Sequence, residues 1–294
     1  MACSAGVDSS ALAFALASAT SEIVLGHVVH DLRGRVAREG DRDAARDLAA
    51  RLGVEFAHAD VTIERRGNLE AGARRARYTA LAGMAEASGC EFVATGHQAD
   101  DQLETVLMQL LRGRRSLAGA APTRRLTRGV RLIRPMLVVT RAEAEAICRS
   151  ARWAWREDAT NEDESRLRAA LRGRVLPILR ELSPTVAGRA VRIARVQREM
   201  DEALEVWAAS VPCVRTEGEI EWRRGDVAGL PPAVRAELLR SGLAGVGARA
   251  AAGRELDAMA RAMGERAPKR YGIAGACVLI DGEGTRILAS GRSV

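Results

Sequence analysis

The sequence predicts an α/β protein whose first part is built on a parallel β-sheet and whose C-terminal part is a smaller unit. In the first half of the chain, apolar stretches typical of buried strands alternate with stretches typical of helices. This order favours parallel strands covered by helices on both faces. The chain has 294 residues, 47% of them hydrophobic, which suffices for one large core and one smaller core.

The first part contains alternating elements whose ends are marked by glycine or by capping residues. Asp100 is expected to cap the last helix of this alternation, and Thr140 with Glu143 forms a capping box for a further helix. Ligands in such folds collect at the carboxyl ends of the strands. The expected elements are strands at 22–30, 54–59 and 91–95 and helices at 41–52, 69–88 and 100–112.

The second part begins after a long helix that starts near Ser183 and Pro184. Beyond it we expect a helix after Pro231 and a hairpin that turns at 281–284. We therefore predict a Rossmann-like catalytic domain at 1–182, a linker helix at 183–210 and a C-terminal domain at 211–294. The last of these is expected to be α/β or mostly helical.

Composition excludes several classes of protein. The chain has no apolar run of about 18 residues and no basic segment at its start, so we expect no membrane span, no signal peptide and a cytoplasmic location. Its five cysteines include no C-x-x-C pair, which argues against a disulfide scaffold, a zinc site and an iron–sulfur cluster.

Positive charge is concentrated in two tracts. The net charge is +7, and nine arginines and no acid occur between residues 106 and 141. Nine more arginines and one acid occur between residues 166 and 198. Such clustering is typical of a polyanion partner, and a solvated basic surface is the alternative.

Residues 4–9 (SAGVDS) form a small-residue turn in front of a helical stretch. Backbone N–H groups at such a helix start are able to bind an anion such as phosphate. The turn lacks the lysine of a Walker-type loop, which excludes that class. An ordinary strand–helix loop remains the alternative for a turn this short.

This turn resembles the Ser-Gly-Gly-x-Asp-Ser loop of the N-type ATP pyrophosphatases, the PP-loop family. Four later segments narrow the resemblance to the tRNA(Ile)-lysidine synthetases and extend it over residues 1 to about 180. These are 27–33 (HVVHDLR), 67–78 (GNLEAGARRARY), 96–105 (GHQADDQLET) and 157–161 (EDATN), the last followed by Arg168, Arg172 and Leu176-Pro177.

The resemblance implies an ATP-dependent carbon–nitrogen ligase that modifies the wobble cytidine of the isoleucine tRNA with a CAU anticodon. ATP would adenylate the cytosine carbonyl with release of pyrophosphate, and the amine of free L-lysine would then displace AMP to form lysidine. The substrates and cofactor implied are ATP, L-lysine, tRNA(Ile) and Mg²⁺. A homodimer is compatible with the sequence, which does not determine the oligomeric state.

The resemblance also implies a role for particular residues. ATP would be bound by Ser4, Ala5, Gly6, Val7, Asp8 and Ser9, with Asp8 as the metal ligand. Asp8, His97, Asp101 and Glu104 would form the catalytic group, and Asp100, Asp101 and Glu104 would bind lysine or magnesium. The tRNA would be bound by Arg74, Arg77, Arg112, Arg114, Arg115, Arg168 and Arg172. The C-terminal domain at 211–294 would recognise the tRNA.

Each assignment has a simpler alternative. The acids at 100–104 lie at the start of a helix, where carboxylates also serve as ordinary caps. His97 has an ordinary pKa near neutrality and suits either a phosphate contact or a reacting group, but a buried structural histidine is equally compatible. Arg74 and Arg77 would form a solvated salt-bridge face in the simpler interpretation.

Three residues depart from the family pattern: Ala5 replaces a glycine, Gln98 a histidine and Ala169 an asparagine. Ala5 is tolerable where φ is negative and costs on the order of 1 kcal/mol or more in a left-handed conformation. The family also has a strand before the loop, where only residues 1–3 stand here. We expect about 10–20 further residues upstream, including an apolar strand.

Three rival functions remain. A catalytically inactive relative that only binds tRNA is motivated by Ala5, Gln98 and the short first strand. A tRNA 2-thiolation enzyme shares the loop but normally needs cysteines that this chain lacks. GMP synthetase shares the loop but explains neither the arginine tracts nor the segment at 100–105.

Overall fold

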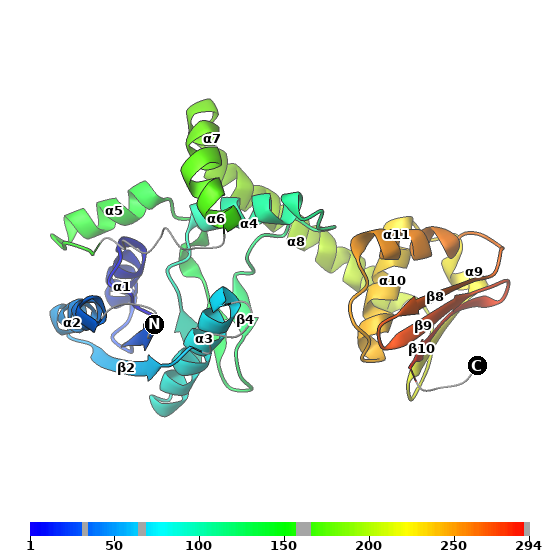
Figure 1. Cartoon of the computed structure of the whole chain (residues 1–294), viewed down its shortest axis with the longest axis horizontal. Helices are drawn as coiled ribbons and strands as arrows, with labels where there is room; N and C mark the ends of the chain where they lie inside the picture. The colour runs from blue at the N-terminus through cyan, green and yellow to red at the C-terminus, as the bar shows by residue number, and fades with distance from the viewer. Residues whose placement is uncertain (31–34, 64–68, 157–165, 291–294) are drawn as a thin grey trace. The chain divides into compact units, whose positions relative to one another are not determined.

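The computed structural model describes residues 1–30, 35–63, 69–156 and 166–290, and parts of the resembling segments fall outside these ranges. The chain forms two compact units (Figure 1). The first comprises Met1–Arg112 and Leu117–Arg195, and the second comprises Gly113–Ser116 and Val196–Val294. The boundary between them lies within helix α8 (Val186–Ser210). The three-part division at 182 and 210 stays a prediction.

The strands of the first unit form two small sheets. Strand β1 (Val24–His30) pairs in parallel with β2 (Glu55–Val61). Strand β3 (Phe92–Ala94) pairs in parallel with β5 (Arg131–Ile133), and β4 (Thr123–Arg125) adds an antiparallel edge to β5. The predicted parallel α/β class is confirmed, and the antiparallel edge is an addition to it.

Residues 1–3 lie between β1 and β3. The Ala2 N–H donates to the Ala94 carbonyl at 2.8 Å, on the β3 side. The Cys3 N–H donates to the Gly26 carbonyl at 2.9 Å, on the β1 side, where Ala2 and Gly26 form a parallel bridge. This short segment therefore occupies the central position between the two sheets and leads directly into the loop at 4–9.

Helices cover these sheets. Val7, Ala11 and Leu12 of the first helix pack in one buried cluster with Ala144 and Cys148 of the fifth. That packing holds the start of the first helix against the start of the fifth. The helices are α1 (Val7–Ala19), α2 (Arg35–Leu52), α3 (Leu69–Ala87), α4 (Ala99–Leu111), α5 (Arg141–Ser150), α6 (Arg166–Ala170) and α7 (Leu176–Leu182), with a 3₁₀ turn at Pro135–Val138 and a π-helical turn at Leu171–Val175.

Helix α4 begins differently from the prediction that Asp100 caps it. Gln98 is the capping residue, and its side-chain oxygen accepts from the Asp100 N–H at 3.3 Å. The Asp101 carboxylate accepts in return from the Gln98 N–H at 2.9 Å. Asp100 therefore lies inside the first turn, because the glutamine amide satisfies the same N–H groups as an aspartate cap would.

The second unit contains a five-stranded antiparallel sheet in the order β6-β7-β10-β9-β8 with helices α10 and α11 packed against it (Figure 1). The predicted hairpin is confirmed: Asp281 accepts from the Glu283 and Gly284 N–H groups in its turn. Of the two expectations for this part, the mixed one is confirmed. Its elements are β6 (Val214–Thr216), β7 (Glu219–Arg223), α9 (Arg224–Val227), α10 (Pro232–Gly245), α11 (Gly253–Ala262), β8 (Lys269–Ile273), β9 (Ala276–Ile280) and β10 (Gly284–Ala289).

Across the helices that the structure describes, none combines the length and apolar character needed to cross a bilayer.

Candidate functional site

The loop at 4–9 turns directly into helix α1. Gly6 is the capping residue, with φ −73°, and no side chain caps the first N–H groups of the helix. The Ser9 hydroxyl holds the turn together: it accepts from the Ser4 N–H at 3.2 Å and donates to the Gly6 carbonyl at 3.0 Å. Uncapped N–H groups and the helix dipole favour an anion at this point.

Ala5 adopts the left-handed conformation, with φ 59°, and its side chain is 1% exposed. Its carbonyl accepts from the Arg156 N–H at 3.0 Å, which helps to hold this conformation. A left-handed conformation costs an L-residue roughly 1–2 kcal/mol. Alanine in place of glycine is therefore strained at this position, because φ is positive.

Asp8 lies at the start of α1 with only one carboxylate oxygen paired. Its Oδ2 accepts from Arg141 Nη1 at 3.3 Å, while its Oδ1 is buried without a hydrogen-bond partner. Burial raises the pKa of Asp8 to about 6; the Arg141 charge opposes this shift, and the carboxylates of Asp101 and Asp100 add to it. These electrostatic effects place the predicted acids of α4 near the loop.

Gly96 lets the end of β3 approach this loop. A Cβ atom at Gly96 would lie 2.8 Å from the backbone carbon and oxygen of Asp8 and 2.9 Å from the Ser9 nitrogen. Real Cβ atoms do not approach backbone so closely, so only glycine fits here without displacing the loop. Gly96 belongs to the segment 96–105 that resembles the family, but the sequence does not indicate its contact with the loop.

His97 is neutral at physiological pH. Its Nδ1 contacts the Thr95 hydroxyl at 2.8 Å. Burial, which is the largest cause, and the charges of Arg134, Arg77, Arg74 and Arg168 together lower the pKa of His97 to about 3. The expectation of a pKa near neutrality is therefore wrong, because it took no account of burial and of the surrounding arginines.

The predicted acids of α4 are paired with predicted RNA-binding arginines. Glu104 is 2% exposed and accepts from Arg168 Nε at 2.9 Å and from Arg172 Nε at 2.5 Å. Arg172 Nη2 also donates to Asp101 at 3.4 Å. The acids expected to bind lysine or magnesium and the arginines expected to bind tRNA therefore neutralise each other in this structure.

Asp100 and the remaining arginines have different surroundings. Asp100 pairs with Arg180 at 3.0 Å, an arginine that sequence reasoning did not select. Arg112 follows the end of α4 and is exposed, as is Arg114. Arg115 forms an ion pair with Asp257 within the second unit.

Arg141 is the other functional candidate that sequence reasoning missed. It begins α5, pairs with Glu145 at 3.1 Å and reaches Asp8 across 133 positions of sequence. Nothing local distinguishes it from the other arginines of its tract. Only the packing of α5 against α1 brings it to the phosphate loop.

The loop offers one carboxylate oxygen that is suited to binding a magnesium ion. Asp8 offers a buried carboxylate oxygen with no partner, and Mg²⁺ in phosphate sites needs only one or two carboxylates together with substrate phosphates and water. Within the part of the chain that the structure describes, no three His, Cys, Asp or Glu side chains are grouped so as to hold a metal. Asp8 is thus the candidate ligand.

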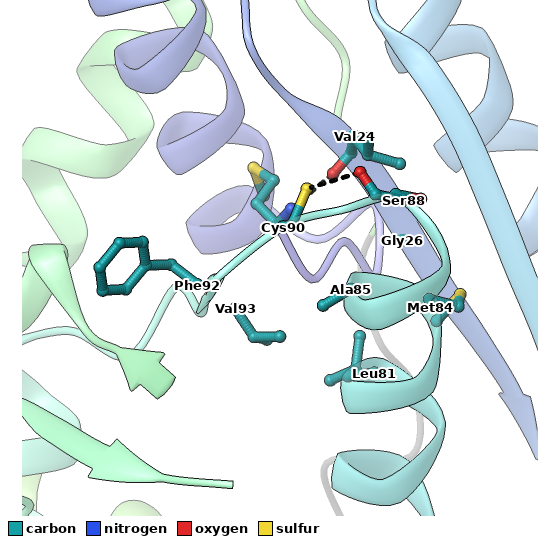
Figure 2. A pocket seen from close by; sticks show the side chains of 10 residues that line it. Val24, Gly26, Leu81, Met84, Ala85, Ser88, Cys90, Phe92 and Val93 are labelled. Atoms are coloured by element: carbon teal, nitrogen blue, oxygen red, sulfur yellow. Dashed lines mark hydrogen bonds between the residues drawn. The ribbon is translucent and has the colours of Figure 1, made fainter. Parts of the chain in front are cut away.

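A small pocket elsewhere in the first unit has a different character. Figure 2 shows it between β1, the end of α3 and β3, with Leu81, Met84 and Val93 among its lining residues. Its polar members are few, and Cys90 Sγ is already engaged with the Ser88 carbonyl at 3.7 Å. None of the predicted site residues lines this pocket, so it does not serve as the candidate site.

Comparison with known proteins defines the class first. Residues 1–179 match the PP-loop domain family, and the fold resembles that of a U34-tRNA thiolase from Methanococcus maripaludis solved with its [4Fe-4S] cluster. That similarity has a TM-score of 0.57 and 18% sequence identity and covers 66% of this chain and 70% of the thiolase. At this identity the similarity concerns the fold alone.

Relatives at higher identity define the family within that class. The chain is 40% identical to the tRNA(Ile)-lysidine synthase of Salinispora arenicola, over 88% of this chain and 80% of the relative. It is 40% identical to that of Deinococcus deserti, over 71% of this chain, and 39% identical to those of Thermus thermophilus, over 70%. The chain spans 39% and 40% of the length of these latter relatives. It belongs to the tRNA(Ile)-lysidine synthase family of PP-loop proteins.

Proposed function

We propose that this chain catalyses ATP-dependent ligation of L-lysine to the wobble cytidine of a CAU-anticodon isoleucine tRNA. The observation that carries the proposal is the loop at 4–9. It combines uncapped helix N–H groups with a buried, unpaired carboxylate oxygen of Asp8. The 40% identity to tRNA(Ile)-lysidine synthases supports the particular reaction.

The loop would bind the phosphates of ATP. Backbone N–H groups of Gly6, Val7 and Ser9 and the Ser4 hydroxyl offer donors, and the dipole of α1 favours the negative charge. Asp8 would hold Mg²⁺, which when bound offsets the charge of the phosphates. Arg141 adds a cation beside Asp8.

The first chemical step joins the cytosine carbonyl oxygen to the α-phosphorus of ATP and breaks the bond to pyrophosphate. In the second step the lysine amine attacks the activated ring carbon, loses a proton and displaces AMP. In the protein without ligands His97 is neutral, because its pKa is about 3. It is therefore available as a hydrogen-bond partner and does not contribute a cation.

The acids of α4 would bind the amino-acid substrate. Asp100, Asp101 and Glu104 present carboxylates that suit an ammonium group, and each is now neutralised by an arginine. A lysine ligand would exchange with these guanidinium groups and release them towards RNA. Arg168 and Arg172 would thereby pair with the acids before lysine binds and with tRNA afterwards.

A cytoplasmic location and a homodimer stay predictions.

The test is mass analysis of nucleosides from tRNA(Ile) incubated with the protein, ATP, Mg²⁺ and lysine. Lysidine in the digest is the expected result. Asp8→Ala should abolish ATP–pyrophosphate exchange, a loss of at least about 100-fold, while tRNA affinity stays almost unchanged. Equal loss of exchange and tRNA affinity would show that Asp8 acts structurally, and a digest without lysidine would reject the reaction.

The second candidate is a relative that binds tRNA without catalysis. The left-handed conformation of Ala5 favours it, because the strained methyl group lies in the loop that should hold ATP. AMP release in the presence of tRNA and lysine separates the two functions. A protein that binds tRNA tightly and releases no AMP would be the inactive relative.

A further inference from the structure

Three arginines surround the ring of Tyr78 in the first unit. The guanidinium carbons of Arg74, Arg77 and Arg124 lie 5.0, 5.3 and 4.8 Å from the centre of the ring. Arg74 and Arg77 come from α3, and Arg124 comes from the edge strand β4, 46 positions further along the chain than Tyr78. The antiparallel edge of the sheet therefore completes a cationic group that begins on a helix.

The floor of this group has unsatisfied polar atoms. Tyr78 is 5% exposed and Arg134 is 7% exposed. By strict geometry the Tyr78 hydroxyl and the Arg134 Nε are both buried without a hydrogen-bond partner, although Arg134 Nη1 donates to the Ala121 carbonyl and the Arg134 side chain lies beside the Tyr78 hydroxyl. Buried polar groups are nearly always satisfied by protein, water or ligand, so two such atoms in one cluster indicate a missing partner.

The positive charge around these atoms favours an anion as their partner. Among the described side chains, no acid forms an ion pair with Arg74, Arg77, Arg124 or Arg134. Burial raises the pKa of Tyr78, but the charges of Arg74, Arg77 and Arg134, together with the close approach of the Arg134 side chain to the hydroxyl, outweigh burial and lower it overall. The same arginines lower the pKa of His97. The cluster is thus a region of concentrated, uncompensated positive charge.

We propose that Arg74, Arg77, Arg124, Arg134 and Tyr78 form a site for one phosphate of an RNA backbone. Forked guanidinium donors and a phenolic hydroxyl match the several oxygens of a phosphate. Arg77 and Arg124 are exposed and Tyr78 and Arg134 are buried, so the site is open to a large ligand and has a fixed floor. The phosphates of ATP already have their own place at α1. This proposal rests on the proposed function in taking RNA as the substrate.

The test compares Arg124→Ala with Arg125→Ala. Both residues are exposed on β4 and both changes remove one positive charge, but only Arg124 contacts the Tyr78 ring. Affinity for tRNA is measured over a range of salt concentrations without ATP or lysine. Arg124→Ala should lower the slope of log affinity against log salt by about 0.7–0.9, the value of one phosphate contact. Arg125→Ala should leave it unchanged.

A second variant removes only the hydroxyl at the floor of the site. Tyr78→Phe keeps the ring and every charge, so it should weaken tRNA binding by roughly fivefold, the value of one hydrogen bond, with the salt slope unchanged. Melting curves of each variant show whether it has folded. Tyr78→Phe with wild-type tRNA affinity would show that the hydroxyl does not contact the ligand and would overturn its part in the site.

Two further outcomes would overturn the phosphate site as proposed. Equal salt slopes for Arg124→Ala and Arg125→Ala would mean that neither arginine reads a particular phosphate. A raised KM for ATP with an unchanged tRNA salt slope would assign the cluster to the nucleotide. Because binding is measured without turnover, a wild-type protein that forms no lysidine but shows the predicted slopes would reject the function and retain the site.

Discussion

The two sides of the candidate site differ in how their charges are satisfied. On the loop side, Asp8 keeps one buried carboxylate oxygen without a partner and its helix begins without a side-chain cap. On the α4 side, Glu104 is almost fully buried between two guanidinium groups. A ligand can therefore bind to the loop directly, whereas on α4 it must displace arginines.

This difference has an energetic basis. A buried carboxylate needs compensation, and the ion pairs of Glu104 supply it in the structure without substrate. At the loop the cost of the unpaired oxygen appears in the pKa of Asp8, which burial raises to about 6. We infer that the unpaired oxygen of Asp8 lowers the stability of the protein without ligand and leaves the loop ready to bind one. On α4 the ion pairs of Glu104 stabilise the protein without ligand.

The largest expected effect is the loss of stability when the ion pairs of Glu104 on α4 are removed. Glu104→Gln leaves the partly buried Arg168 and Arg172 beside a neutral, buried amide, and losing one partner of a buried ion pair costs about 3 kcal/mol. Urea unfolding measures this loss. The control is Glu145→Gln, which also pairs with two arginines but lies at the surface, and it should cost below about 1 kcal/mol. Equal destabilisation by both changes would contradict the comparison.

The next effect concerns the approach of β3 to the loop. Gly96→Ala places a methyl group against the backbone of Asp8 and Ser9, which should cost about 1–3 kcal/mol and impair ATP–pyrophosphate exchange more than tRNA binding. Gly83→Ala is the control, because Gly83 lies in α3 with open space around it. That change should stabilise the protein by about 0.5–1 kcal/mol. Normal exchange in Gly96→Ala would show that the loop shifts freely.

A smaller effect removes the cation beside Asp8. Arg141 favours the ionised carboxylate, so Arg141→Ala should raise the pKa of Asp8 above its value of about 6. The acid limb of kcat/KM for ATP should then move to higher pH, by up to about one unit, with more activity lost at pH 6 than at pH 8. Arg149→Ala also loses a contact with Glu145 but does not touch Asp8. It should keep the wild-type pH profile.

The smallest effect is expected at Ala5. Ala5→Gly relieves roughly 1–2 kcal/mol of left-handed strain, but it loses the burial of one methyl group, about 0.8 kcal/mol, and makes the unfolded chain more flexible by about 0.5–1 kcal/mol. The net change in the free energy of unfolding should stay within about 1 kcal/mol, and turnover should be unchanged or higher. A clear fall in turnover of a folded variant would show that the methyl group has a packing role.

Local features of the sequence predicted much of this fold. The loop at 4–9 and the capping box of Thr140 and Glu143 depend on residues within a few positions of each other, and the structure confirms both. The hairpin at 281–284 is confirmed for the same reason. The prediction that Asp100 caps α4 is wrong, because Gln98 offers an equivalent oxygen two positions earlier. The candidate site residues follow from the resemblance of their motifs to those of the family.

The relations between these residues were decided only by the tertiary structure. Glu104 lies 64 and 68 positions from the arginines that it binds, and Asp8 lies 133 positions from Arg141. Likewise, the low pKa of His97 arises from burial and from arginines on α3, after β5 and on α6. Burial and Coulomb interactions depend on distance in space, so a sequence determines which charges exist but only the packed fold decides which of them meet.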